Sequence, residues 1–101
     1  MDGEQGVAPG SVPVRSLSVR ARNVGGDIVL AGPDSEEPVT LSDTAGFLWR
    51  SMDGRRSIRA LGELLTERYA VDVETAVSDV TDMVVELAGL QLVTVTPAPG
   101  R

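Results

Sequence analysis

The sequence contains no cysteine, no histidine and no lysine among its 101 residues. The absence of cysteine excludes disulfide bonds and thiolate chemistry. The absence of histidine removes the commonest general base and the commonest metal ligand. A serine or threonine nucleophile would therefore lack the partner that usually activates it. We accordingly expect no catalytic residues, no bound metal and no cofactor, and we predict that the chain is not an enzyme.

The sequence also lacks long apolar runs and is poor in aromatic residues, which make up 3% of the chain. No run approaches the roughly 18 apolar residues of a membrane span. The N-terminus is acidic and rich in glycine and proline, unlike a signal peptide with its basic and apolar regions. A net charge of −6 argues against nucleic-acid binding, which relies on basic patches. We therefore expect a cytoplasmic protein that binds neither membranes nor nucleic acids.

The remaining composition suits one small domain, since 42% of the residues are hydrophobic. Residues 1–15 contain few large apolar side chains and are predicted to form a flexible tail. Residues 97–101 are expected to form a second tail. The folded domain is therefore predicted to span residues 16–96.

Three short strands are predicted in the first half of this domain. Over Leu17–Arg22 apolar residues alternate with polar ones, which is the period of a half-buried strand. Asn23–Gly26 supplies turn residues that tolerate positive φ, so a hairpin to the strand Asp27–Ala31 is expected. A turn at Gly32–Ser35 leads to a third strand at Pro38–Leu41. Its proline has no N–H to donate, which suits a sheet edge.

Three capped amphipathic helices are predicted after the third strand. Ser42, Ser57 and Asp72 are favourable N-cap residues, and Gly54 and Gly89 are expected to end the first and third helices. Residues 90–96 form either a short strand or an extended tail. Apolar side chains recur every three or four residues and mark the buried faces. These residues are Ala45, Leu48, Trp49 and Met52 in the first helix, Ile58, Leu61, Leu64, Leu65 and Tyr69 in the second, and Val73, Val77, Val80, Val84 and Leu87 in the third.

The predicted order is therefore a three-stranded antiparallel sheet followed by three helices. A tight turn that contains Gly54 joins the first two helices. This is an α+β fold with a winged helix-turn-helix-like layout.

This ordered set of elements resembles the PqqD-like family. The resemblance runs from Leu17 to Val93 and includes the hairpin SVRARNVGGDIVLAG, the strand–helix–turn–helix segment VTLSDTAGFLWRSMDGRRSIRALGELLTERY and the third helix VDVETAVSDVTDMVVELAGLQLV. Members of this family act as RiPP recognition elements, which bind the leader peptides of ribosomally synthesised and enzymatically modified peptides. The chain departs from the family pattern in its long N-terminal tail and in its C-terminal end, LVTVTPAPGR.

The resemblance implies a peptide-binding groove between the third strand and the third helix. In the family, the leader is understood to pair with the edge of the third strand and to pack against the third helix. Acidic side chains beside the groove would select basic leader residues. On this chain the implied leader-binding residues are Pro38, Val39, Thr40, Leu41, Thr75, Asp79, Asp82, Met83 and Glu86.

The residues alone leave other interpretations of some positions open. The acidic residues of the third helix also fit a solvated face, and Met83 also fits a wider core face. Four arginines surround the turn between the first two helices and admit three interpretations: a solvated turn, a docking patch for a modifying enzyme, or a contact to DNA phosphates. They are Arg50, Arg55, Arg56 and Arg59.

The predicted function is to capture the leader peptide of a precursor and to deliver the attached core peptide to a separate enzyme. Binding of the leader holds the core peptide at a high effective concentration near that enzyme. The resemblance implies a leader protease or a radical-SAM enzyme as the partner, and we favour the leader protease of a lasso-peptide system. The alternative is a winged-helix regulator that binds DNA or a protein. DNA binding would place a basic helix in the major groove, whereas the third helix is acidic.

Overall fold

A computed structural model of the protein describes residues 7–33, 37–41 and 43–97. Within these ranges the chain forms five strands and three helices. In chain order they are β1 (Val12–Arg15), β2 (Arg20–Val24), β3 (Asp27–Ala31), β4 (Val39–Leu41), α1 (Asp43–Ser51), α2 (Ile58–Arg68), α3 (Val73–Gly89) and β5 (Val93–Thr96). The predicted α+β fold with a three-stranded antiparallel sheet and three helices is confirmed, and β1 and β5 form a second, two-stranded sheet beside it.

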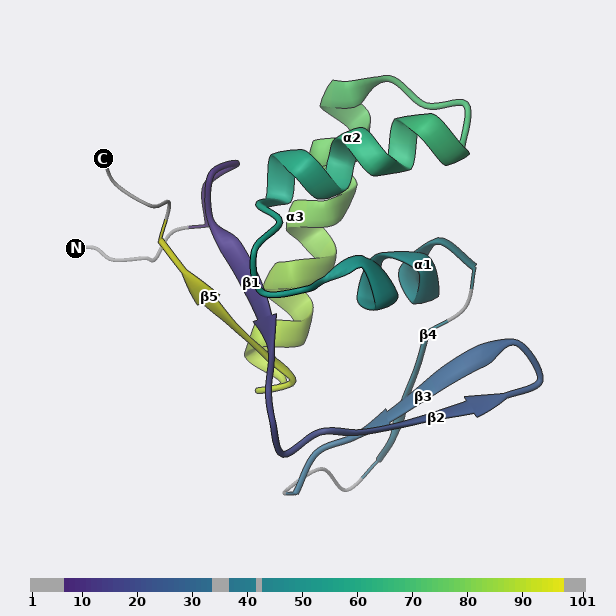
Figure 1. Ribbon diagram of the computed structural model, residues 1–101. Coiled ribbons are helices and arrows are strands. Elements are labelled where there is room, and N and C mark those ends of the chain that lie inside the picture. Colours follow the sequence, from purple (N-terminus) through teal and green to yellow (C-terminus); the bar gives the residue numbers. More distant parts are fainter. Residues whose placement is uncertain (1–6, 34–36, 42, 98–101) are drawn as a thin grey trace.

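The larger sheet has the order β2-β3-β4 and is antiparallel throughout (Figure 1). The predicted hairpin between β2 and β3 is confirmed. Its two-residue turn is formed by Gly25 and Gly26 with φ of 60° and 96°, values that glycine adopts readily and that match a type I′ turn. β4 lies at one edge of this sheet, as its sequence predicts, while the predicted turn at Gly32–Ser35 falls partly outside the described residues.

The prediction for the first strand of this sheet was wrong in two respects. The strand begins at Arg20, and Leu17 lies before it with its side chain fully exposed. All five residues of β2 are exposed. Alternation of apolar and polar residues predicts that a strand has one apolar and one polar face. The apolar face is buried only where another layer of the protein covers it. β2 is an edge strand, and no described part of the chain covers it as such a layer.

The second sheet pairs β1 with β5 in antiparallel register, from Val12 opposite Thr96 to Arg15 opposite Val93. β1 lies in the stretch that composition predicts to be a flexible tail, and this prediction was wrong for residues 12–15. Ser11 and Val12 are buried, at 3% and 7% exposure. The strand is stabilised by a partner from the far end of the chain, which local composition cannot reveal. Residues 1–6 and 98–101 lie outside the described ranges.

The caps predicted for α2 and α3 are confirmed. The Ser57 hydroxyl accepts a hydrogen bond from the N–H of Ala60 at 3.1 Å. An Asp72 carboxylate oxygen accepts one from the N–H of Thr75, also at 3.1 Å. α1 ends at Ser51, three residues before its predicted stop at Gly54, whose φ is 79°. The cap predicted at Ser42 lies outside the described residues.

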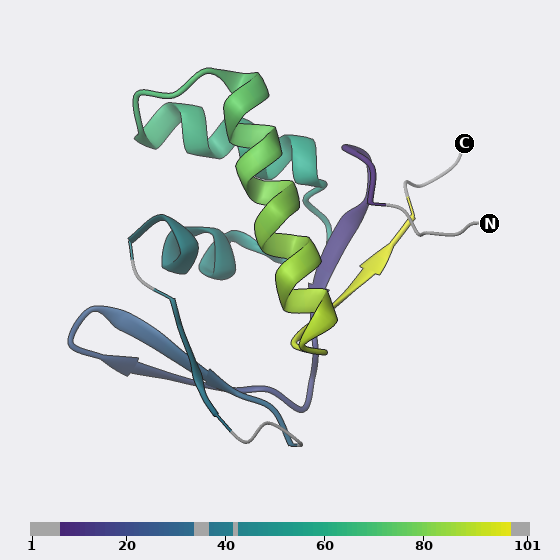
Figure 2. The same ribbon diagram turned by 180° about the vertical axis from the view of Figure 1, so that it is seen from behind.

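α3 is the central helix of the fold (Figure 2). It contacts α2 along one side and β5 near its C-terminal end. The buried face agrees with the prediction except at Val73, which is 38% exposed, while Ala76 in the next turn is fully buried. Periodic spacing identifies the face of a helix but not how far a neighbouring helix extends along it. Trp49 in α1 is 4% exposed and belongs to the core, as predicted. No helix in the described part of the chain has the length and apolar character needed to cross a membrane.

α2 and α3 approach each other closely at Gly62. A Cβ atom on Gly62 would lie 2.8 Å from Val77 Cγ2 and 3.1 Å from the backbone nitrogen of Val77. We expect Gly62→Ala to lower the free energy of unfolding by about 1–3 kcal/mol, because the helices must separate to admit a methyl group. Gly89→Ala is the matched control, since a Cβ there meets nothing within 4 Å. Denaturant titration of both variants tests this, and equal stabilities would contradict it.

Candidate functional site: a groove between β4 and α3

A groove of about 520 Å³ lies between β4, the N-terminal half of α1 and α3. Its lining comes from three elements that are adjacent in space: β4 and α1 follow each other directly in the chain, and α3 faces them. The lining residues are Val39, Thr40 and Leu41 from β4, Thr44, Ala45 and Leu48 from α1, and Asp79, Asp82, Met83, Glu86 and Leu87 from α3.

The groove has an apolar floor and an acidic rim. Leu41, Leu48 and Leu87 are buried, at 6%, 2% and 2% exposure, and form the floor. Met83 is half-buried, whereas the three carboxylate residues of α3 on the rim are exposed. An apolar floor with polar groups at its border is typical of sites that bind a ligand through burial and orient it through polar contacts.

The β2–β3 hairpin determines which backbone N–H and C=O groups of β4 point towards the open edge of the sheet. In a two-residue hairpin the residues that flank the turn form a hydrogen-bonded pair, here Val24 and Asp27. Hydrogen-bonding directions alternate along an antiparallel strand, so Ile28 and Leu30 direct their N–H and C=O groups towards β4. Their register partners there are Leu41 and Val39.

Thr40 lies between these two hydrogen-bonded pairs, opposite Val29. Its N–H and C=O therefore point away from β3, towards the open edge of the sheet. The side chains of Val39 and Leu41 are half-buried and buried, and that of Thr40 is exposed. The open edge thus presents a backbone donor and a backbone acceptor at Thr40, beside the apolar floor.

The structure gathers most of the residues that the family resemblance implies, but not all. Seven of the nine line the groove, while Pro38 and Thr75 do not. Pro38 immediately precedes β4 and is exposed. The Thr75 hydroxyl donates to an Asp72 carboxylate oxygen at 2.8 Å and belongs to the cap of α3. Their assignment to leader binding, like that of the other seven, stays a prediction.

Sequence reasoning missed the contribution of α1 to the groove. Thr44, Ala45 and Leu48 line it, although Ala45 and Leu48 were assigned only to the core face of their helix. The signal that points to them is the absence of any loop between β4 and α1, with a single residue separating the two elements. A helix that begins so close to an edge strand necessarily stands beside that edge.

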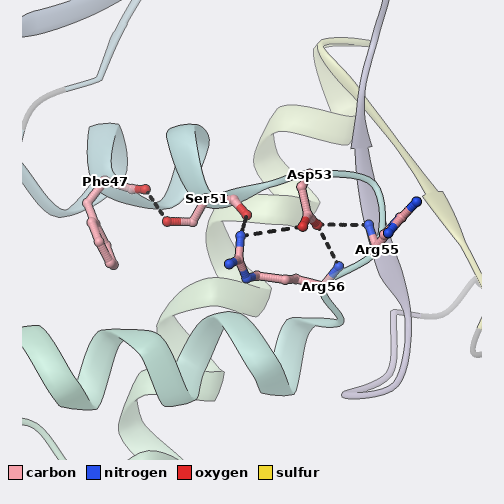
Figure 3. A network of polar contacts seen from close by, with 5 residues as sticks. All are labelled: Phe47, Ser51, Asp53, Arg55 and Arg56. Atoms are coloured by element: carbon pink, nitrogen blue, oxygen red, sulfur yellow. Dashed lines mark hydrogen bonds and ion pairs between the residues drawn. The ribbon is translucent and has the colours of Figure 1, made fainter.

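The four arginines near the α1–α2 turn do not act as one cluster. The Arg56 guanidinium donates to the Ser51 carbonyl at 2.9 Å and lies 3.5 Å from an Asp53 carboxylate oxygen. Figure 3 shows both contacts. The other Asp53 oxygen accepts from the backbone N–H groups of Arg55 and Arg56 at 2.9 and 2.8 Å. These bonds close the turn between the two helices, so Arg56 has a structural partner.

The remaining two arginines lie in different surroundings. Arg50 folds back along α1, where its Nη1 is 3.6 Å from the place that a Cβ on Gly46 would occupy. Arg59 is exposed, and its backbone N–H donates to the Pro9 carbonyl at 2.9 Å. In the described part of the chain, no group of three or more acidic side chains is arranged to hold a metal ion.

The fold and the groove define a small α+β domain with three helices and an open sheet edge beside an apolar hollow. Residues 27–93 match the model of the family described as coenzyme PQQ synthesis protein D (PqqD). Because the match spans more than half of the chain, the protein belongs to the PqqD family. No curated protein matches the chain.

Two solved structures share this fold. One is the PqqD truncation of Methylobacterium extorquens PqqCD, described as a functional and stand-alone RiPP recognition element, with 24% identity and a TM-score of 0.75 over 88% of this chain and 95% of that one. The other is TbiB1 in complex with the TbiA(β) leader peptide, with 19% identity and a TM-score of 0.72 over 79% of this chain and 93% of that one. At these identities the likeness establishes the fold.

The caps and the turn make the stability of the domain depend on pH. Hydrogen bonds from the hydroxyl and the N–H of Thr75 hold the pKa of Asp72 below its usual 3.8. The N–H groups of Arg55 and Arg56, with the charge of Arg56, do the same for the pKa of Asp53. A carboxyl whose pKa is lower in the folded than in the unfolded state stabilises the fold above the unfolded-state pKa. That stabilisation is lost as the pH falls through the folded-state pKa.

We therefore expect the Tm to fall as the pH is lowered from about 6 to about 2, and Asp72→Asn to reduce this fall, because asparagine caps a helix without titrating. Glu63→Gln, which removes an exposed carboxylate outside any cap, is the control. Thermal melting followed by circular dichroism gives the Tm at each pH. Parallel curves for Asp72→Asn and the wild type would show that the cap carries no such dependence.

Proposed function

We propose that the protein is a RiPP recognition element that binds the leader segment of a precursor peptide as an added strand on β4. The observation that carries this proposal is the outward-facing N–H and C=O of Thr40 beside the apolar groove between β4 and α3. An extended peptide can form main-chain hydrogen bonds with such an edge while its side chains fill the adjacent floor.

The relatives support this proposal. The chain belongs to the PqqD family, one solved structure with the same fold is described as a functional RiPP recognition element, and the other is a complex with a leader peptide. The assignment of leader binding to Val39–Leu41 and to α3 of this chain rests on its own groove, whose floor of buried leucines lies directly beside the open edge.

The protein acts by proximity. A bound leader holds the attached core peptide near the active site of a separate enzyme and raises its effective concentration there. By analogy within the family we propose the leader protease of a lasso-peptide system as that enzyme, acting in the cytoplasm. The other candidate partner is a radical-SAM enzyme, and testing the enzymes encoded beside this gene would distinguish the two. The exposed Arg50, Arg55, Arg56 and Arg59 are candidate contacts for the enzyme, and Arg56 also forms an ion pair with Asp53.

Catalysis belongs to the partner, because this chain has no histidine, cysteine or lysine to activate a nucleophile or to carry an intermediate. We expect the purified protein to leave a precursor peptide unchanged in mass after prolonged incubation. Mass spectrometry with and without the partner enzyme is the measurement. A mass change that persists in protein purified twice from independent hosts would overturn this assignment.

The test of the binding mode is a pair of substitutions at Thr40. Thr40→Pro removes the outward N–H, and we expect leader affinity to fall by about tenfold or more, since a lost hydrogen bond also leaves its peptide partner unpaired. Thr40→Val keeps the N–H and should bind like the wild type. Fluorescence titration with a leader peptide encoded beside this gene gives the affinities, and circular dichroism verifies the fold.

Val39→Pro is the comparison variant for the inner side of β4. The Val39 N–H faces β3, so its loss should lower the Tm of the protein by breaking a hydrogen bond within the sheet. If Thr40→Pro fails to fold, leader peptides that are N-methylated at one residue at a time provide the test. N-methylation should weaken binding at every second residue, because only alternate N–H groups of an added strand face β4. Unchanged affinity of a folded Thr40→Pro protein would contradict strand addition at β4. Binding of duplex DNA that weakens steeply with salt would favour the regulator alternative.

A further inference from the structure

Among the described residues that line the groove, every charged side chain is acidic. The rim of the groove carries Asp79, Asp82 and Glu86, all exposed, and its lining includes no arginine. Three carboxylates on neighbouring turns of one helix repel one another, and the repulsion increases when a ligand displaces the water between them. A neutral or acidic ligand in the groove would therefore be bound at an electrostatic cost that a cationic ligand avoids.

The dimensions of the rim match a short piece of extended peptide. The helix rises about 1.5 Å per residue, so Asp79 and Glu86 are separated by about 10 Å along α3. An extended peptide covers this length in about three to four residues, at roughly 3.3 Å per residue. Roughly three to four residues of a peptide strand are therefore as long as the row of three carboxylates.

The floor adds a second requirement. Leu41, Leu48 and Leu87 are buried beneath the groove and Met83 is half-buried at its side. The stems of arginine and lysine pack well on such a surface while their charged ends reach a polar border. The floor favours apolar side chains or long aliphatic stems, and the rim favours positive charge at their ends.

We infer that the natural ligand of this groove is an amphipathic peptide whose bound segment is cationic, with apolar residues on the floor and arginine or lysine directed to the α3 rim. This inference rests on the proposed function and names the chemistry of the leader. Each exposed pair contributes little, so the carboxylates act together to select the ligand and its register. The net charge of −6 also speeds the approach of such a peptide.

The experiment uses three fluorescein-labelled peptides of equal length and the same apolar positions, with arginine, serine or glutamate at the remaining positions. We expect the arginine peptide to bind most tightly, the serine peptide more weakly and the glutamate peptide weakest. Raising the salt concentration should reduce the difference, because exposed charges are screened. Titration of the wild-type protein with each peptide gives the dissociation constants.

Charge-neutralising variants then locate the effect. We expect Asp82→Asn and Glu86→Gln each to weaken the arginine peptide about two- to fivefold. The serine peptide should bind to these variants no more weakly than to the wild type, because the repulsion between the carboxylates is reduced. Glu63→Gln in α2 changes the net charge of the protein equally and lies outside the groove. It should therefore have little effect. These exposed substitutions leave the buried core untouched, and a Tm measurement verifies this.

The outcomes separate this inference from the proposed function. Equal loss of affinity in Glu63→Gln and Asp82→Asn would show that attraction to the whole protein, rather than the rim, is responsible. Equal affinity for all three peptides, with binding still abolished in Thr40→Pro, would overturn the inference and leave strand addition intact. Binding of the arginine peptide that survives Thr40→Pro undiminished would place it outside the groove and contradict both.

Discussion

The close contact of α2 and α3 at Gly62 is the constraint on which the rest of the structure depends. The backbone of Val77 approaches Gly62 so closely that no larger residue fits between the helices without displacing one of them. This contact fixes α3 with its buried line of Ala76, Val80, Val84 and Leu87 turned to the core. Since these residues occupy one side of the helix, Asp79, Asp82 and Glu86 are necessarily presented on another, where they border the groove.

The second determinant of the groove is the two-glycine turn that joins β2 and β3. Positive φ at Gly25 and Gly26 makes a two-residue hairpin, and the alternation of hydrogen bonds then propagates across β3 to β4. The direction of the Thr40 backbone groups follows from that turn. A one-residue shift in the hairpin would point them into the sheet and leave the open edge without its donor and acceptor at that position.

The domain combines these features into one candidate binding surface. The backbone groups at Thr40 can form hydrogen bonds with the main chain of a peptide of any sequence. Strand addition alone would therefore contribute affinity but no sequence selectivity. In the binding mode proposed above, selection comes from the floor, which favours apolar contact, and from the rim, which favours positive charge. The Arg56–Asp53 contacts near the α1–α2 turn stabilise the connection between the two helices.

The sequence by itself determined the local structure: the caps at Ser57 and Asp72, the glycine turn, the buried position of Trp49 and the edge character of β4. Each depends on residues within a few positions of one another. Only the tertiary structure decided that β1 pairs with β5 from the opposite end of the chain, that β2 has no covering layer, and that α1 completes the groove with Thr44, Ala45 and Leu48. These features depend on contacts between distant segments, and neither propensity nor periodicity records which segments will meet.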